Sequence, residues 1–369
     1  FFFFNWEQFR VGGNIIPDVI SVPTAEYRQG NFSRALGAQL GTDALLRPIF
    51  TNQIYDPNTR RTVTCMAGAT SCTAGASVTI TDPFAGNIIP QNRLDPVALK
   101  VQALLPNPEN PNATLNNFTG SYIQERVTGV PSFKIDHVVT SKHKFSFTFN
   151  RTRTKCDFCA GANGTPLPIS PAIGTDVRAH TERLNWDTTI SPTMLLHWGI
   201  GWTQNWLGRP PLFDGFDATA ELGLRGPFTG ITSTFPNFTG LVHATNNQAG
   251  GMANISSTPG SDDVFQQGTA IVSLTWVKDN HTYKFGGELR NQGDYALNDS
   301  ARNGVYNFGP EQTTMPYLAA TNAGVVGSNP TGFNYASFLL GLVRNGNVRA
   351  GSRARIGKQQ WGFYAQDTW

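Results

Sequence analysis

The sequence predicts an all-β protein of long antiparallel strands in up-and-down order, and three observations predict it. Apolar and polar residues alternate strictly along five segments of the chain. Short turns and long irregular stretches alternate between those segments. Charged residues make up only 14% of the 369 residues, while 38 glycines and 23 prolines indicate many turns and loops rather than helices.

The segment Thr193–Trp206 shows the clearest alternation. One of its faces is apolar and consists of Leu196, Trp198, Ile200 and Trp202. The opposite face consists of His197, Gly199, Gly201 and Thr203. A period of two over about 14 residues predicts a strand much longer than the usual five or six residues of globular proteins.

Further segments follow the same pattern less completely. Four alternate clearly, with their charged residues expected on the polar face: His143–Asn150, Glu182–Ile190, Gly268–Val277 and His281–Arg290. Five weaker strands are expected at Phe1–Val11, Tyr122–Thr128, Phe133–Thr140, Tyr335–Val343 and Gln359–Trp369. The prediction is therefore a sheet of about ten strands.

The connections between strands fall into two classes. Short turns are expected at Ser141–Lys144, Ser191–Thr193 and Lys278–His281. Long irregular stretches are expected at Thr152–Ala179, Leu207–Gln267 and Gln292–Phe333. Because alternate connections of an up-and-down sheet lie at the same end, one end has tight turns and the other has large loops, which is typical of outer-membrane β-barrels.

The alternative interpretation of this pattern is a secreted β-sandwich, whose strands also alternate. Strand length favours a membrane, since a tilted spanning strand needs about 9–11 residues. Aromatic residues near strand ends favour it too, because outer-membrane barrels have aromatic girdles at both interfaces. The residues concerned are Trp202, Trp206, Trp276, Tyr283 and Trp361. The predicted fold is therefore a transmembrane barrel, present in part.

The region 15–120 is rich in proline, glycine and asparagine, and we expect it to form a long loop or cap, with barrel hairpins and loops in 121–369. One short helix is expected in this region. Asp95 is suited to the N-cap and Pro96 to the first turn, an apolar stripe follows, and Pro106 ends the helix.

Four cysteines form two local pairs, Cys65 with Cys72 and Cys156 with Cys159. Two disulfides that pin extracellular loops are one interpretation, and free thiols or a redox or metal site are the others. The glycine- and proline-rich run after Cys159 does not suit a thioredoxin-like helix, and no HxxxH pattern accompanies the cysteines to form a zinc site.

Neither composition nor motifs indicate an enzyme or a nucleic-acid-binding protein. The net charge is only +3, and no lysine and arginine cluster stands out. The GxSxG, HExxH and GK[ST] patterns are not found, and the six histidines are scattered. We therefore expect no catalytic centre, no cofactor and no nucleic-acid partner.

Several stretches together resemble the TonB-dependent outer-membrane receptors of the Oar-like group. They occur in the family's order, from FFFFNWEQFR through VPTAEYRQGNFS, IYDPNT, NIIPQNRLDPVA and FKIDHVVTSKHKFSF to HTYKFGGELR, ASFLLGL and YAQDTW. Each match is weak alone, but the ordered set is more specific and extends over the whole chain.

The resemblance implies a location in the outer membrane of a Gram-negative bacterium and uptake of an unidentified nutrient. It implies contact with membrane lipid, with the receptor's own plug domain and with TonB. No plug or TonB box is recognised here, so the chain is expected to be an internal fragment of a larger barrel. Lumen-facing plug contacts are expected from Arg183, Asn185, Asp187, His197, Lys284, Glu288 and Arg290. The alternative function is a surface β protein that binds glycans or mediates adhesion through its loops.

Overall fold

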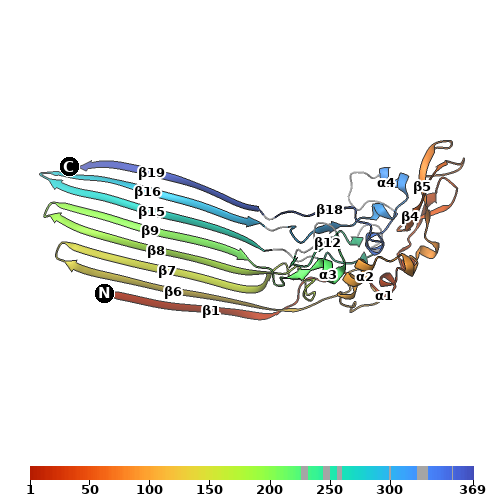
Figure 1. The fold of residues 1–369 in the computed structure, drawn as a ribbon, viewed down its shortest axis with the longest axis horizontal. Helices are drawn as coiled ribbons and strands as arrows, with labels where there is room; N and C mark the ends of the chain where they lie inside the picture. The colour runs from red at the N-terminus through yellow and green to blue at the C-terminus, as the bar shows by residue number, and fades with distance from the viewer. Residues whose placement is uncertain (226–231, 244–249, 256–259, 299–300, 322–330, 351) are drawn as a thin grey trace.

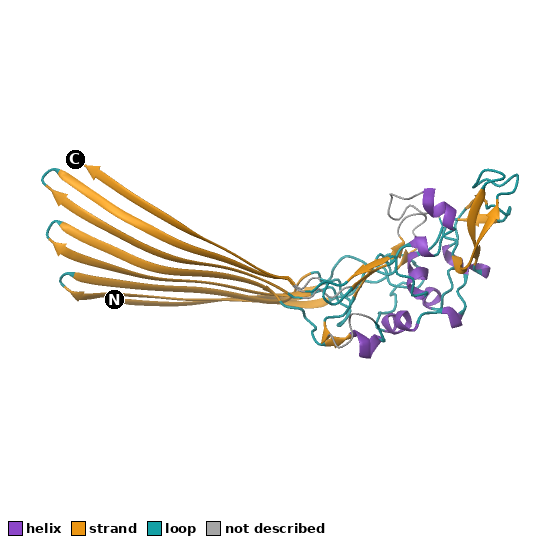
Figure 2. Ribbon diagram, turned by 45° about the horizontal axis from the view of Figure 1, so that its top comes forward, coloured by secondary structure: helices purple, strands orange, loops and turns teal. Residues whose placement is uncertain are grey.

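The computed structural model has one large sheet and one folded cap at its end (Figure 1). It describes residues 1–225, 232–243, 250–255, 260–298, 301–321, 331–350 and 352–369. In both views the long strands lead from short turns at one end to the cap at the other, where the helices gather (Figure 2). The sheet and the cap therefore occupy opposite ends of the molecule.

Eight antiparallel strands form the sheet in the order β1-β6-β7-β8-β9-β15-β16-β19. Their bounds are β1 Phe2–Ile15, β6 Tyr122–Thr140, β7 His143–Ala160, β8 Ile173–Ser191, β9 Met194–Arg209, β15 Ser261–Lys278, β16 His281–Asn298 and β19 Ser352–Thr368. Each strand pairs with its neighbour in this order, so the sheet is up-and-down throughout. β1 and β19 stand at the two ends of the order.

The alternation of short turns and long connections is confirmed. Only residues 141–142, 192–193 and 279–280 separate the strands at one end of the sheet. Residues 16–121, 161–172, 210–260 and 299–351 connect them at the other end. In the last of the short turns Asp279 adopts a positive φ of 52°, as tight hairpin turns require.

The expected strand number of about ten is too high, for two physical reasons. Tyr122–Thr128 and Phe133–Thr140 belong to one strand, β6, which continues through Pro131. Tyr335–Val343 is not a strand, because helix α5 spans Asn334–Leu339 and is buried on all sides. A short apolar run buried all round lacks the periodicity that separates a strand from a helix.

Two of the expected long loops are shorter than predicted, and the third begins later than predicted, because the strands continue beyond the apolar alternation. The third also extends further, to residue 351, because no strand of the sheet forms at Tyr335–Val343. β7 continues to Ala160 and β8 begins at Ile173, so that most of 152–179 is strand. Likewise β15 begins at Ser261 and β16 continues to Asn298. These extensions have polar residues on both faces, so hydrophobic periodicity does not reveal them.

The strand register gives the sheet two distinct faces. One row across it joins Phe147, Leu184, Ile200, Ala270, Leu289 and Trp361. We call this the apolar face and the opposite side the polar face. Cross-strand aromatic pairs lie on the apolar face, such as Trp186 and Trp198, whose ring centroids are 6.1 Å apart.

The apolar residues form a band that covers the half of this face nearest the short turns. Along β15 the band extends from Trp276 to Gly268, about nine residues or about 27 Å along the strand. That length matches the apolar belt of outer-membrane barrels, which is about 25 Å tall. Trp276 and Tyr283 pair at its turn end, with centroids 5.5 Å apart, and Trp202 lies at its other end. Trp361, by contrast, lies inside the band, in the row of Ala270 and Leu289.

Glu182 is an exception to the predicted placement of charges on the polar face. It lies on the apolar face, paired in register with Phe149 on one side and Trp202 on the other. Both neighbours belong to the last row of the band, so Glu182 is at its border. A carboxylate at this level can reach water, which makes its cost much smaller than at the band's centre.

The long connections fold together into the cap, which contains the buried hydrophobic core of the described structure. Its helices are α1 (Ala25–Arg28), α2 (Pro96–Ala103), α3 (Ala218–Leu222), α4 (Pro316–Thr321) and α5. Its strands are β2 (Gln39–Thr42), β3 (Pro48–Phe50), β4 (Tyr55–Thr64), β5 (Ser77–Pro83), β10 (Phe216–Asp217), β11 (Thr232–Ser233), β12 (Asn237–Thr239), β13 (Val242–His243), β14 (Gly250–Gly251), β17 (Val305–Asn307) and β18 (Asn345–Asn347). The cap is therefore a folded unit and not a set of separate loops.

The helix predicted in the cap is confirmed as α2. The carboxylate of Asp95 accepts a hydrogen bond of 2.9 Å from the backbone N–H of Ala98, as an N-cap does. Val101 is fully buried against the core. The expectation of a single helix in this region is too low, since α1 also lies there.

Aromatic packing unites distant parts of the chain in the cap core. Phe32 lies 4.9 Å from Phe333, and Phe338 lies 6.0 Å from Phe238, measured between ring centroids. The first pair joins the connections 16–121 and 299–351, and the second pair joins the connections 210–260 and 299–351. The core therefore holds the long connections to one another at the cap end of the sheet.

Ion pairs support the cap at its surface. Arg61 and Arg47 both contact the carboxylate of Asp82, and their hydrogen bonds lower its pKa to about 2. Hydrogen bonds from Arg93 likewise lower the pKa of Asp56. Both carboxylates stay ionised at any pH near neutrality, so these pairs persist under ordinary conditions.

Candidate functional site

All seven residues expected to face a barrel lumen lie on the polar face. Asp187 pairs with His197 in the register of β8 and β9, and Glu288 lies opposite Ile271 on β15. Paired residues of neighbouring strands share a face, and residues two apart on a strand share it as well. The set Arg183, Asn185, Asp187, His197, Lys284, Glu288 and Arg290 is therefore on one side of the sheet.

Three of these side chains line a groove at mid-sheet, which we call the polar groove. Arg183 approaches it from β8, and Glu288 and Arg290 approach it from β16. Its volume is about 260 Å³. The groove brings together residues more than 100 positions apart in the sequence, a proximity that strand periodicity alone does not reveal.

Two glycines of β9 make room for the polar groove. Gly199 and Gly201 lie on the polar face between β8 and β15, and both line the groove. A Cβ atom at Gly201 would meet only the backbone oxygen of Glu182, at 3.5 Å, so space above it is open. At Gly199 a Cβ would approach the side chain of Asn185 to 2.8 Å. The missing side chains are therefore what hollows the face here.

The walls of the polar groove present matched donors and acceptors. Arg290 donates from Nε and Nη2 to the two carboxylate oxygens of Glu288, at 2.5 and 3.1 Å. Gln292 donates to Gln267 at 2.8 Å, and Gln267 donates to Thr269 at 3.2 Å. This arrangement suits binding of a polar group or a polar polypeptide segment, and it contains no nucleophile paired with a base.

The other four predicted residues lie nearer the short turns and do not line the polar groove. His197 Nδ1 and Asp187 Oδ1 are 2.7 Å apart across the β8–β9 pair. Asn185 donates to Ser146 Oγ on β7 at 3.4 Å. These hydrogen bonds join neighbouring strands at a level of the sheet separate from the polar groove, so the seven residues share a face but do not all line one groove.

The four cysteines form two disulfides, Cys65–Cys72 and Cys156–Cys159. Cys65–Cys72 lies in the cap, beside the core cluster that contains Tyr55 and Ile80. Cys156–Cys159 lies where β7 ends at the cap. Within the described residues no group of three histidine, cysteine or acidic side chains is placed to bind a metal ion.

Sequence reasoning missed a set of cations on the apolar face beyond the band. They are Arg151, Arg153 and Lys155, which continue the face of Phe145, Phe147 and Phe149 along β7. The signal was present in FSFTFNRTRTK, where the period of two passes from phenylalanine to cations without interruption. The predicted loop at Thr152–Ala179 concealed it.

No described helix combines the length and the apolar composition needed to cross a membrane.

Comparisons with known proteins match the chain to a family model and to solved structures. No curated protein matches the chain. Among solved structures, the outer membrane transporter YddB from Escherichia coli is similar at 11% identity, with a TM-score of 0.44. That similarity covers 68% of this chain and 26% of the YddB chain. The family model for the outer membrane beta barrel domain matches residues 1–369, and the chain therefore belongs to the outer membrane β-barrel domain family.

Proposed function

We propose that this chain is the barrel part of a TonB-dependent receptor that imports an unidentified nutrient across a Gram-negative outer membrane. The observation that supports it best is the two-faced sheet, with an apolar band of membrane height on one side and the polar groove on the other. An outer-membrane barrel places its apolar belt toward lipid and its polar face toward the lumen.

In this proposal the short turns lie in the periplasm and the cap lies outside the cell. The edge strands of the sheet are β1 and β19. Within a bilayer, each backbone N–H or C=O group left without a hydrogen bond at such an edge costs about 2–7 kcal/mol. We therefore infer that further strands pair with both edges in the complete barrel, as the resemblance to Oar-like receptors implies.

The polar groove is proposed to contact a plug domain inside that barrel. Arg183 is presented to the lumen, and the Arg290–Glu288 pair lies across the groove from it. A plug must stay docked at rest and move when TonB transmits energy, which favours polar contacts over a continuous apolar interface. Arginine and carboxylate groups beside open glycine surface meet that requirement.

A matched pair of glycine substitutions tests this role. We expect Gly201→Trp to reduce nutrient uptake to the level of a deletion strain, because the indole fills the polar groove. Gly268→Trp is the control, since Gly268 lies in a neighbouring register position but on the apolar face, where a Cβ meets only the Trp202 ring at 3.6 Å. Depletion of medium components by wild-type and variant cells, followed by mass spectrometry, measures uptake without knowledge of the substrate.

The rival function is a surface protein that binds glycans through the cap, which the folded cap core favours. The two functions differ in energy coupling. The transport proposal expects at least one medium component to be depleted only when both this protein and a functional TonB system are present. Depletion that is identical in the deletion strain, together with loss of cell adhesion or glycan binding, would contradict transport and support the rival.

A further inference from the structure

Three cations follow directly beyond the apolar band on the outward side of the sheet. Arg151, Arg153 and Lys155 alternate along β7, and Phe149, two residues before Arg151, ends the band on this strand. Each step of two residues advances about 6.7 Å along a strand. The first cation therefore lies within one such step of the last aromatic row. We call these three residues the basic cluster.

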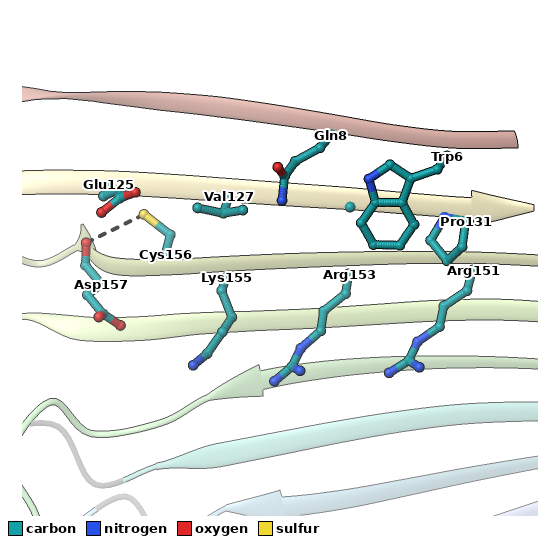
Figure 3. A pocket seen from close by; sticks show the side chains of 11 residues that line it. Trp6, Gln8, Glu125, Val127, Pro131, Arg151, Arg153, Lys155, Cys156 and Asp157 are labelled. Atoms are coloured by element: carbon teal, nitrogen blue, oxygen red, sulfur yellow. Dashed lines mark hydrogen bonds between the residues drawn. The ribbon is translucent and has the colours of Figure 1, made fainter.

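The basic cluster lines a groove of about 540 Å³ across β1, β6 and β7 (Figure 3). Small residues of β6 create it, since Gly129 lies opposite Arg153 and Pro131 lies opposite Trp6. Trp6 and Pro131 form an apolar wall at the end next to the band. The carboxylates of Glu125 and Asp157 lie at the other end, nearest the cap. Within this groove the three cations thus lie between the apolar wall and the two carboxylates.

Neutralisation within the basic cluster is incomplete. Arg153 binds Asp176 with two hydrogen bonds of 3.0 and 2.8 Å. The same carboxylate also accepts from Arg178 at 2.6 Å, so two guanidinium groups share one negative charge. Among the described residues, neither Arg151 nor Lys155 forms an ion pair. These two side chains remain available to an external anion.

Arg178 of β8, next to the basic cluster, is held in place by stacking on Trp206 as well as by Asp176. The guanidinium carbon of Arg178 lies 3.7 Å from the centroid of the Trp206 ring. A cation held between a carboxylate and an indole is preorganised rather than free to follow solvent. Arg178 therefore differs from the lysines and arginines of many membrane proteins, whose side chains only extend toward the water above the bilayer.

We propose that the basic cluster binds the phosphate groups of a phosphorylated glycolipid in the outer leaflet. The proposal rests on the outward, lipid-facing orientation of the apolar face in the function proposed above. Phosphates of that leaflet lie at the level where the apolar band ends, which is the level of Arg151. Guanidinium and ammonium groups are the preferred protein partners of phosphate, and the wall of Trp6 and Pro131 suits the apolar part of the same lipid.

A double substitution tests the proposal while it leaves the Arg153–Asp176 pair intact. The variant R151Q/K155Q removes the two unpaired cations. The control R353Q/R355Q removes the same charge from the apolar face of β19, where Arg355 lies in the same cross-sheet row as Arg153. The probe is diphosphoryl lipid A, mixed with the purified full chain in detergent and quantified by native mass spectrometry.

We expect the wild-type chain and the R353Q/R355Q control to retain the lipid equally. Loss of two charge-assisted contacts should lower retention by R151Q/K155Q about tenfold or more. Lipid A from which both phosphates have been removed should not be retained by the wild-type chain. Inorganic phosphate at millimolar concentration should not displace the bound lipid, because it lacks the apolar part.

Equal retention by R151Q/K155Q and the wild type would overturn the proposal, as would equal binding of the dephosphorylated lipid. Displacement by inorganic phosphate alone would assign the cluster to a free anion and overturn the lipid as occupant. The assay requires no uptake, so its failure is separable from failure of the transport function. Normal nutrient uptake with unchanged lipid retention in the variant contradicts only the lipid site.

Discussion

Replacement of Val272 by arginine is expected to destabilise the inserted sheet by about 2–4 kcal/mol, the cost of a cation at the middle of a barrel's lipid face. Val272 lies at the centre of the apolar band, between Trp198 and Gly287 in register, and its side chain is 49% exposed. Because the described residues leave the Val272 side chain partly exposed, an arginine at this position would face the hydrocarbon of the bilayer.

The neighbouring residue provides the matched control. Ser273 is next in sequence but lies on the polar face, opposite His197 and Gly286. Ser273→Arg should fold into the membrane almost as well as the wild type, because its guanidinium reaches the lumen. The free energy of folding of both variants is measured by urea titration in lipid vesicles. The folded fraction is read from the difference in gel migration between unboiled and boiled samples. Equal destabilisation by the two substitutions would contradict the assignment of the faces.

The second large effect is expected in the cap. Phe338 is only 1% exposed and packs edge-on against Phe308 and against Phe238, at centroid distances of 5.3 and 6.0 Å. Phe338→Ala should destabilise the cap by about 3–5 kcal/mol, the usual cost of truncating a buried phenylalanine. Since the cap core is separate from the apolar band, the strands should remain folded.

Limited proteolysis distinguishes the two parts. In F338A, protease is expected to cleave the long connections rapidly while the strands stay protected in membrane vesicles. Leu99→Ala is the control, because Leu99 lies on the same cap but is 38% exposed, and it should leave the digestion rate near that of the wild type. Cleavage of F338A at the wild-type rate would contradict a cap stabilised by its own core.

The strand faces were predictable wherever one side of a strand meets an apolar medium. Leu196, Trp198 and Ile200 alternate with polar residues because only one face of β9 belongs to the band. Beyond Phe149 both faces of β7 are polar, so Arg153 and Lys155 were assigned to a loop although they belong to the same strand. Hydrophobic periodicity reports the environment of a strand and not its hydrogen bonds.

Proline and complete burial account for the remaining errors in the fold. Pro131 has no backbone N–H, and the β6–β7 register omits it between Gly129 and Ser132, although β6 continues. Tyr335 and Phe338 belong to α5, which is buried on all sides. Its sequence therefore lacks the alternation of apolar and polar residues every 3.6 positions that reveals a helix with one exposed face. Neither feature can be resolved from the local sequence.

The candidate site was predictable in its side of the sheet but not in its shape. Arg183 and Glu288 each alternate with apolar residues along their strands, and this period of two is enough to place both on the polar face. Their meeting in one groove depends on the pairing of β9 with β15, which spans a connection of about 50 residues. The role of Gly201 follows only from that pairing.

A cysteine scan along β15 tests the central claim most directly. Single cysteines at positions 269–276 can receive a fluorophore, because the native cysteines are paired in disulfides. In vesicles that contain brominated lipid, the account predicts strong quenching at positions 270, 272, 274 and 276 and weak quenching at the positions between them. Quenching that is uniform along the strand, or strong at 269, 271, 273 and 275 instead, would contradict a sheet with its apolar band toward lipid and its polar groove toward a lumen.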